Sequence, residues 1–271
     1  LSASRIAGSL LSTAENILIP RQLQLHGQNT AQALSTYGEL TGMAMPLILL
    51  PSACLMAASI SLVPEISEAS AVKQESRISK TVSATFLFTF IVGFGAAALF
   101  AVFPKEICYV VYDRAALGQV LFPLAFLCPL VYAQMTLHGL LNGLGEQFFL
   151  FWNNIVSSLI TIAVIWFAMP RFGIAAFLAG WLLSLLFSVF TALHRLWLRT
   201  GVVPSLYNCF LKPLLAGAAA GLLIKYFIRI SEPSKVLFLG SMFGMGVLYL
   251  LFLFVLGCLS KKDMELILGK K

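Results

Sequence analysis

Long apolar segments recur along this sequence, with short polar segments between them. Several contain 18 or more mostly apolar residues, the length of helix that crosses about 30 Å of hydrocarbon. Only 11% of the residues are charged, whereas a soluble domain typically carries about 25%. We therefore predict an all-α polytopic membrane protein with about eight transmembrane helices. The predicted spans cover residues 1–25, 34–67, 81–103, 117–141, 148–169, 174–196, 209–228 and 236–259.

Two segments depart from simple straight spans. The run 34–67 is too long for one crossing and contains Pro46, Pro51 and Pro64, so we expect a kinked or broken helix there. Residues 104–118 mix apolar and charged side chains. That mixture predicts a short helix lying at the membrane interface.

The excess of basic residues gives a net charge of +7. The 18 Lys and Arg side chains are spread over the connecting segments, so they form no basic stripe and indicate no nucleic-acid partner. Counted on alternate sides of the membrane, eleven fall on the side of the chain ends and seven on the other. Because cytoplasmic loops carry the excess of Lys and Arg, we expect both ends in the cytoplasm.

No motif for metal binding or catalysis stands out. The five cysteines are far apart, with no C-x-x-C pair and no Cys/His cluster at metal spacing. The chain also lacks H-E-x-x-H, G-x-S-x-G and Walker A patterns. We therefore expect no cofactor and no catalytic residue. A membrane enzyme is an alternative of a different class, and the presence of one of these motifs would have favoured it.

Polar residues inside the first span form a stripe. A charge at the bilayer centre costs about 2.5–3.5 kcal/mol, so such residues usually face a cavity or a partner. Glu15 lies beside the stripe, near mid-depth. Its carboxylate is suited to Na⁺ or H⁺, and the planar guanidinium of Arg5 is suited to phosphate. The members of the stripe, which step by three or four residues, are Ser2, Arg5, Ser9, Ser12 and Asn16.

Three further spans carry polar faces, and the last two have almost none. We expect six helices around a wet cavity in residues 1–200, and two additional helices with a basic cytoplasmic tail in residues 201–271. Structural bonding is the alternative, since Ser and Thr can bond their own backbone and Asn or His can bridge helices. The further polar positions are Gln134, His138 and Asn142 on the fourth span, Asn153, Asn154, Ser157, Ser158 and Thr161 on the fifth, and Ser184, Ser188, Thr191 and Arg195 on the sixth.

Three stretches resemble a known family. They are Y-G-E-L-T-G-M-A-M-P at 37–46, L-V-P-E-I-S-E-A at 62–69 and L-N-G-L-G at 141–145. They resemble the polysaccharide-transporter branch of the multidrug/oligosaccharidyl-lipid/polysaccharide (MOP) exporter superfamily, and most of all the stage V sporulation protein B-like group, which is related to lipid II flippases. The eight-span layout resembles helices seven to fourteen of fourteen, which implies that six N-terminal helices are missing.

The resemblance implies two lobes that alternate between inward-open and outward-open states around a polyprenyl-pyrophosphate-linked sugar. It also implies a Na⁺ site among the first, fifth and sixth spans, where this chain offers Asn rather than Asp on the fifth. The cation candidates are Glu15, Asn16, Asn153, Asn154 and Ser157. The candidates for the substrate cavity are Arg5, Ser9, Ser12, Gln134, His138 and Asn142.

These features predict a flippase for lipid-linked oligosaccharide or peptidoglycan precursors in a bacterial plasma membrane, and the resemblance implies that it is coupled to a cation. Its partners would be the lipid-linked substrate, membrane lipid and the missing N-terminal lobe. A multidrug/cation antiporter of the same fold is one alternative, against which the central Arg5 argues. A non-transporting membrane partner of cell-envelope synthesis is another.

Overall fold

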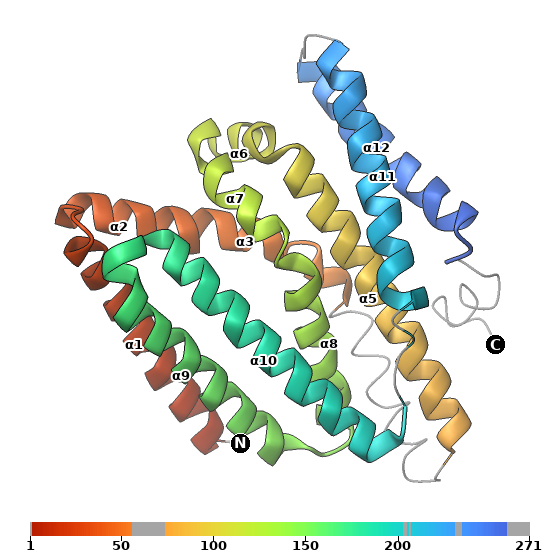
Figure 1. Cartoon of the computed structure of the whole chain (residues 1–271), viewed down its shortest axis with the longest axis horizontal. Coiled ribbons are helices and arrows are strands. Elements are labelled where there is room, and N and C mark those ends of the chain that lie inside the picture. Colours follow the sequence, from red (N-terminus) through yellow and green to blue (C-terminus); the bar gives the residue numbers. More distant parts are fainter. Residues whose placement is uncertain (1, 56–73, 203–204, 206, 231–234, 259–271) are drawn as a thin grey trace.

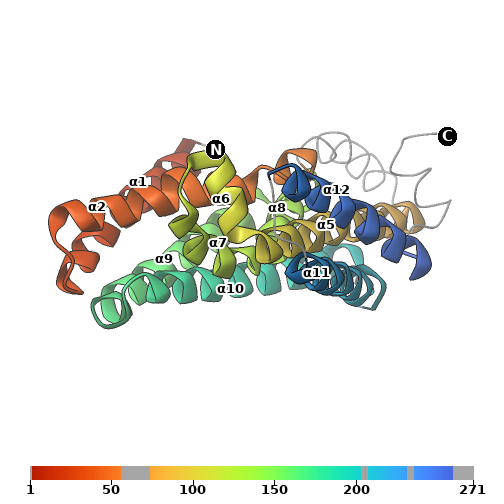
Figure 2. The same cartoon turned by 90° about the horizontal axis from the view of Figure 1, so that it is seen from above.

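The computed structural model describes residues 2–55, 74–202, 205, 207–230 and 235–258, and all regular elements among them are helices. Figure 1 shows them packed side by side, and Figure 2 shows a slab with α9, α10 and α11 along one side. The N-terminal half contains α1 (Ser2–Leu25), α2 (Thr30–Gly38), a π-helical segment (Glu39–Ala44), α3 (Met45–Leu49), α5 (Glu75–Val102), α6 (Pro104–Tyr112) and a 3-10 turn (Ala115–Leu117). The remainder contains α7 (Gly118–Ala125), α8 (Cys128–Gly143), α9 (Gln147–Phe172), α10 (Ile174–Thr200), a second π-helical segment (Tyr207–Leu211), α11 (Lys212–Ile230) and α12 (Lys235–Val255).

Four helices in the described part of the chain are long and apolar enough to cross a membrane. They are Ser76–Val102, Gln147–Phe172, Ile174–Thr200 and Tyr207–Tyr226. A fifth crossing arises if Ala115–Ala125 and Cys128–Gly143, which meet at 56°, form one broken span. The protein is therefore an all-α polytopic membrane protein, as its hydropathy predicts.

Among the described residues, fewer helices are long and apolar enough to cross a membrane than the eight that the sequence predicts. Helix α1 is long enough, but its polar stripe lowers its hydropathy. The apolar part of α12 among the described side chains, Gly240–Val255, is shorter than a full span. The predicted second span extends into residues 56–73 and so lies partly outside the described residues.

The predicted break in the second span is present, with a clear local cause. Pro46 has no N–H to offer the carbonyl of Gly42, and the chain is π-helical immediately before it, over Glu39–Ala44. The helix then ends in a turn at Leu50 and Pro51. Pro64, the third proline used in that prediction, lies outside the described residues.

The predicted short helix in 104–118 is also present, as α6 followed by the 3-10 turn. The hydroxyl of Tyr112, at its end, donates to the carbonyl of Met43 at 3.2 Å. Arg114, between α6 and the 3-10 turn, pairs with Glu39 at 3.0 Å. These contacts hold the connection against the π-helical segment.

Interhelical packing links the long helices through α8, which packs against both α5 and α10. Helix α9 packs between α1 and α10, while α5 packs against α8 on one side and α11 on the other. Gly217 lies where α11 meets α5, because a Cβ there would approach the Phe94 carbonyl to 3.2 Å. Helix α12 contacts α11 and α5. The two helices beyond residue 200 therefore pack onto α5, and the domain boundary at residue 200 stays a prediction.

Candidate functional site

A polar pocket of about 640 Å³ opens between α1, α8 and α9. His138 and Asn142, both predicted cavity residues, line it from α8. Asn154, a predicted cation ligand, lines it from α9, and Gly8 and Leu11 line it from α1. Three residues that the sequence predicts for the site therefore share one pocket. They supply it with one imidazole and two amide groups that can form hydrogen bonds.

Beside the pocket, a hydrogen-bond network joins α8, α9 and α10. The hydroxyl of Ser188, which is fully buried, donates to Asn153 Oδ1 at 2.7 Å. It accepts from Gln134 Nε2 at 2.8 Å and lies 3.4 Å from His138 Nε2. With His138 protonated on Nε2, the single hydroxyl proton and both lone pairs of Ser188 are all used.

Asn153 also serves this network rather than the polar pocket. Its Nδ2 donates to Thr191 Oγ1 at 2.7 Å and to the Ser188 carbonyl at 3.3 Å. The side chain is 5% exposed and bonds across to α10. For Asn153 and Gln134 the structure therefore displays the helix-joining bonds that were the alternative to a ligand-binding role.

The α1 stripe lies on a different face from the pocket. Ser9, Ser12 and Asn16 are exposed, and the Ser12 hydroxyl donates to the Ser9 carbonyl at 3.0 Å. Asn16 Oδ1 accepts from the Tyr37 hydroxyl at 2.6 Å. The side chain of Arg5 is outside the described residues. The predicted cavity role of this stripe therefore concerns an exposed surface, which α2 contacts at Asn16.

The five predicted cation ligands make different contacts in the structure. The Glu15 carboxyl group is half-buried and lies beside Ser158 on α9. Ser157 is buried, and its hydroxyl has no hydrogen-bond partner among the described residues. Within the described ranges, no three His, Cys, Asp or Glu side chains form a group that could hold a metal ion. The Na⁺ site stays a prediction.

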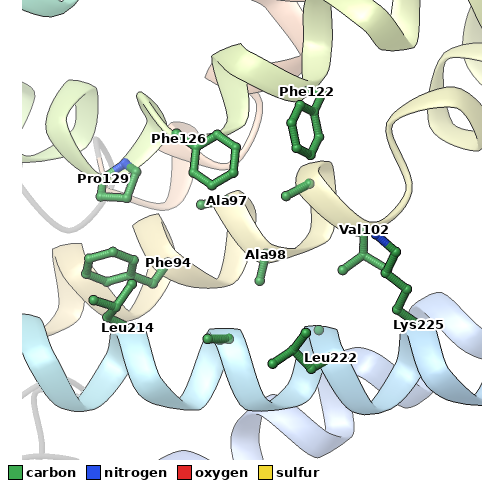
Figure 3. Close-up of a pocket in the computed structure, with 14 residues that line it drawn as sticks. Phe94, Ala97, Ala98, Val102, Phe122, Phe126, Pro129, Leu214, Leu222 and Lys225 are labelled. Carbon is green, nitrogen blue, oxygen red and sulfur yellow. The ribbon is translucent and has the colours of Figure 1, made fainter.

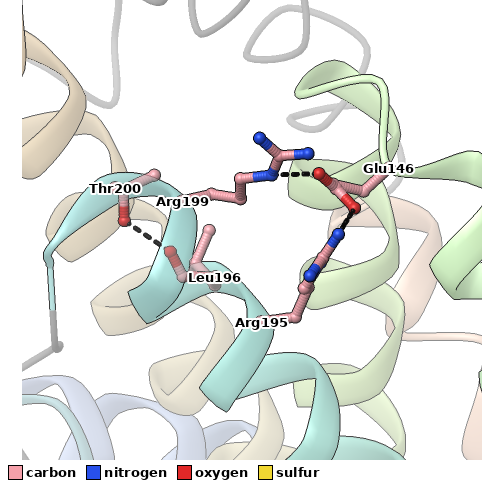
Figure 4. A network of polar contacts seen from close by, with 5 residues as sticks. All are labelled: Glu146, Arg195, Leu196, Arg199 and Thr200. Carbon is pink, nitrogen blue, oxygen red and sulfur yellow. Dashed lines mark hydrogen bonds and ion pairs between the residues drawn. The ribbon is translucent and has the colours of Figure 1, made fainter.

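An ion cluster missed by the sequence analysis lies next to the end of α8 (Figure 4). Glu146 in the α8–α9 connection is 5% exposed, and its Oε2 accepts from Arg195 Nη2 at 2.7 Å and Arg195 Nε at 2.9 Å. Its Oε1 pairs with Arg199 Nε. The sequence carries a signal for this cluster: two arginines four residues apart end one span, and a lone acid precedes the span antiparallel to it.

The charge of Glu146 is stabilised by this arrangement. Burial raises the pKa of Glu146, but the hydrogen bonds and charges of Arg195 and Arg199 outweigh burial and hold that pKa below its ordinary value. The guanidinium of Arg195 also lies over the Phe149 ring, 5.7 Å from its centroid. The cluster therefore fixes the start of α9 to the end of α10 and so supports the polar pocket from outside.

The fold and the site define a class: an all-α protein embedded in a membrane, with a polar pocket and a polar network between its helices. In sequence, the chain is 28% identical over 170 residues to stage V sporulation protein B of Bacillus subtilis (strain 168). The matched segment makes up 63% of this chain and 33% of that protein, so the chain spans about a third of the relative's length. No protein-family model matches the chain. No solved structure matches it either.

Proposed function

We propose that the chain is part of a flippase that moves a lipid-linked cell-envelope precursor between the leaflets of a bacterial plasma membrane. The observation that carries this proposal is the polar pocket between α1, α8 and α9, because polar groups are costly among membrane helices and usually serve a substrate or ion path. The similarity to stage V sporulation protein B supports the same class. Movement by alternating access is part of the proposal.

The pocket chemistry suits a sugar head group. Asn142 and Asn154 offer amide N–H donors and carbonyl acceptors, and His138 offers one ring nitrogen. Sugar hydroxyls both donate and accept hydrogen bonds, so such groups hold them without a fixed charge. In this proposal Arg5 contacts the pyrophosphate through its guanidinium, while the lipid tail remains in the bilayer.

The exposed stripe on α1 supports a second lobe. Ser9, Ser12 and Asn16 are exposed in this chain, and a polar helix face is unfavourable against lipid. A water-filled cavity shared with another lobe would solvate that face. We infer that α1 borders the central cavity, with the stripe toward the cavity and Glu15 toward α9.

Cation coupling through Glu15 is the finer part of the proposal. The carboxyl group lies beside Ser158 and has no ion-pair partner among the described side chains. The same half-buried acid favours a second candidate, a drug/cation antiporter, in which it would contact a cationic substrate. Replacing Glu15 with Gln is expected to abolish cation-dependent transport in the flippase, and unchanged cation dependence would remove Glu15 from the coupling mechanism.

In the decisive experiment, the full-length protein is reconstituted into liposomes that contain a fluorescent polyprenyl-pyrophosphate sugar. Leaflet-to-leaflet movement is compared for wild type, Asn142→Ala and Arg5→Ala. Asn208→Ala is the matched control, since Asn208 is exposed and lies outside the polar pocket. Movement that is lost in the two variants and kept in the control supports the flippase. Absent movement in wild type, or equal movement in all proteins, favours the antiporter or a non-transporting partner of envelope synthesis.

A further inference from the structure

A second pocket, of about 380 Å³, lies between α5, α7, α8 and α11 (Figure 3). Its floor is made of small residues, including Ala97 and Ala98 on α5 and Ala218 on α11. Larger apolar side chains border it, with Phe126 on the α7 side and Leu222 on α11. The lining is almost entirely apolar, so the pocket is suited to a hydrocarbon chain rather than to a sugar or an ion.

One cation marks an end of this pocket. Lys225 lies at one end in Figure 3, and Phe94 and Leu214 lie at the other. The Lys225 side chain is exposed and forms no ion pair or hydrogen bond with the residues that the structure describes. A ligand with a hydrocarbon chain and an anionic group at one end would complement both features.

The dimensions match one leaflet of a bilayer. Leu214 and Lys225 are eleven residues apart on α11, which corresponds to about 16 Å at 1.5 Å per residue. Half of a hydrocarbon core of about 30 Å is about 15 Å. The apolar span through α11 ends at Tyr226, so Lys225 lies where that span meets the head-group region.

We propose that this pocket is a binding site for an anionic phospholipid of the surrounding membrane, with an acyl chain along α11 and its phosphate group on Lys225. The site is separate from the polar pocket, which is lined by α1, α8 and α9. The proposal requires only that the chain is embedded in a membrane, and it does not depend on the flippase function. A bound chain would fill the space between α7 and α11 and stabilise the packing of α11 on α5.

The test titrates the detergent-purified full chain with phosphatidylglycerol or with phosphatidylcholine of the same acyl chains, and counts bound lipid by native mass spectrometry. Wild type is expected to bind one phosphatidylglycerol with higher affinity than phosphatidylcholine. A basic side chain near the surface contributes about 1 kcal/mol toward an anionic lipid, which is about fivefold in affinity. Lys225→Gln is therefore expected to lose about fivefold of that preference.

Two matched controls keep the test specific. Lys105→Gln makes the same charge change on α6, just beyond the end of α5, at a residue that does not line the pocket. Ala218→Trp fills the pocket, while Leu223→Trp places the same ring on an exposed α11 residue outside its lining. Loss of the bound lipid in Ala218→Trp and its retention in Leu223→Trp and Lys105→Gln would support the site.

Three results would overturn the proposal. One is equal affinity for the two phospholipids in wild type. Another is an equal loss of preference in Lys105→Gln and Lys225→Gln, which would indicate non-specific attraction. The third is displacement of the bound phosphatidylglycerol by a polyprenyl phosphate at equimolar concentration, which would assign the pocket to an isoprenoid tail instead.

Discussion

Removing the negative charge of Glu146 tests how firmly the ion cluster holds α9 to α10. In Glu146→Gln the side-chain volume is kept, but Arg195 and Arg199 face a neutral amide. Breaking a fully buried ion pair costs about 3–5 kcal/mol. Here the two arginine side chains are 35% and 55% exposed, so water can solvate them after the change. We expect a loss of about 2 kcal/mol in the free energy of unfolding, near the value of one charge-assisted hydrogen bond.

The free energy of unfolding can be measured by titrating the protein in mixed micelles with sodium dodecyl sulfate. The fluorescence of the four tryptophans reports unfolding. Glu106→Gln is the matched control, because Glu106 is an exposed acid in the first turn of α6 and forms no ion pair with a described residue. Exposed substitutions of this kind change stability by no more than about 0.5 kcal/mol.

The same comparison has a defined pH dependence. Because the pKa of Glu146 is lowered in the folded protein, its stabilisation is present above the ordinary carboxyl pKa and is lost as the pH falls through the folded pKa. The difference between wild type and Glu146→Gln should therefore shrink once the pH drops below about 4.3. A destabilisation no larger than that of Glu106→Gln, or one that persists in acid, would refute the reasoning.

Three further predictions concern the ion cluster, the Ser188 network and the turn between α9 and α10. Arg195→Gln should destabilise the protein more than Arg199→Gln in the same titration, because Arg195 is less exposed and contributes two N–H donors to Glu146; equal losses would contradict this ranking. Ser188→Ala should lower the free energy of unfolding by about 2 kcal/mol, because it leaves the buried amide oxygen of Asn153 without its donor. Unaltered stability would mean that water or a rearranged side chain replaces the hydroxyl. Gly173→Ala should lower the midpoint of thermal unfolding in detergent, because φ at this residue is +57° and a Cβ would lie 2.8 Å from the His26 ring. An unchanged midpoint would show that the turn adapts.

The course of the helices could be predicted from the sequence because hydropathy is a local property. The predicted spans 81–103, 148–169 and 174–196 correspond to α5, α9 and α10, whose observed ends differ by only a few residues at most boundaries. The kink near Pro46 was predictable for the same reason, since a missing N–H acts within one turn. Some observed helices are longer than their apolar segments, because polar residues at their ends continue the helix.

The helix faces show what periodicity can and cannot predict. Helical spacing correctly placed Ser9, Ser12 and Asn16 on one face of α1, but that face is exposed, and Gly8 and Leu11 line the polar pocket instead. Spacing assigns residues to a shared face without specifying the element opposite. That assignment depends on how α1 packs against α9.

The sequence by itself determined the class of fold, the helical segments and the polar positions within them, because each of these follows from local composition and spacing. Only the tertiary structure decided their partners. Asn153 and Asn154 are neighbours in sequence, yet Asn153 bonds to Ser188 and Thr191 on α10 while Asn154 lines the polar pocket. Successive residues of a helix point about 100° apart, so the placement of the surrounding helices assigns one to structural bonding and the other to the candidate site.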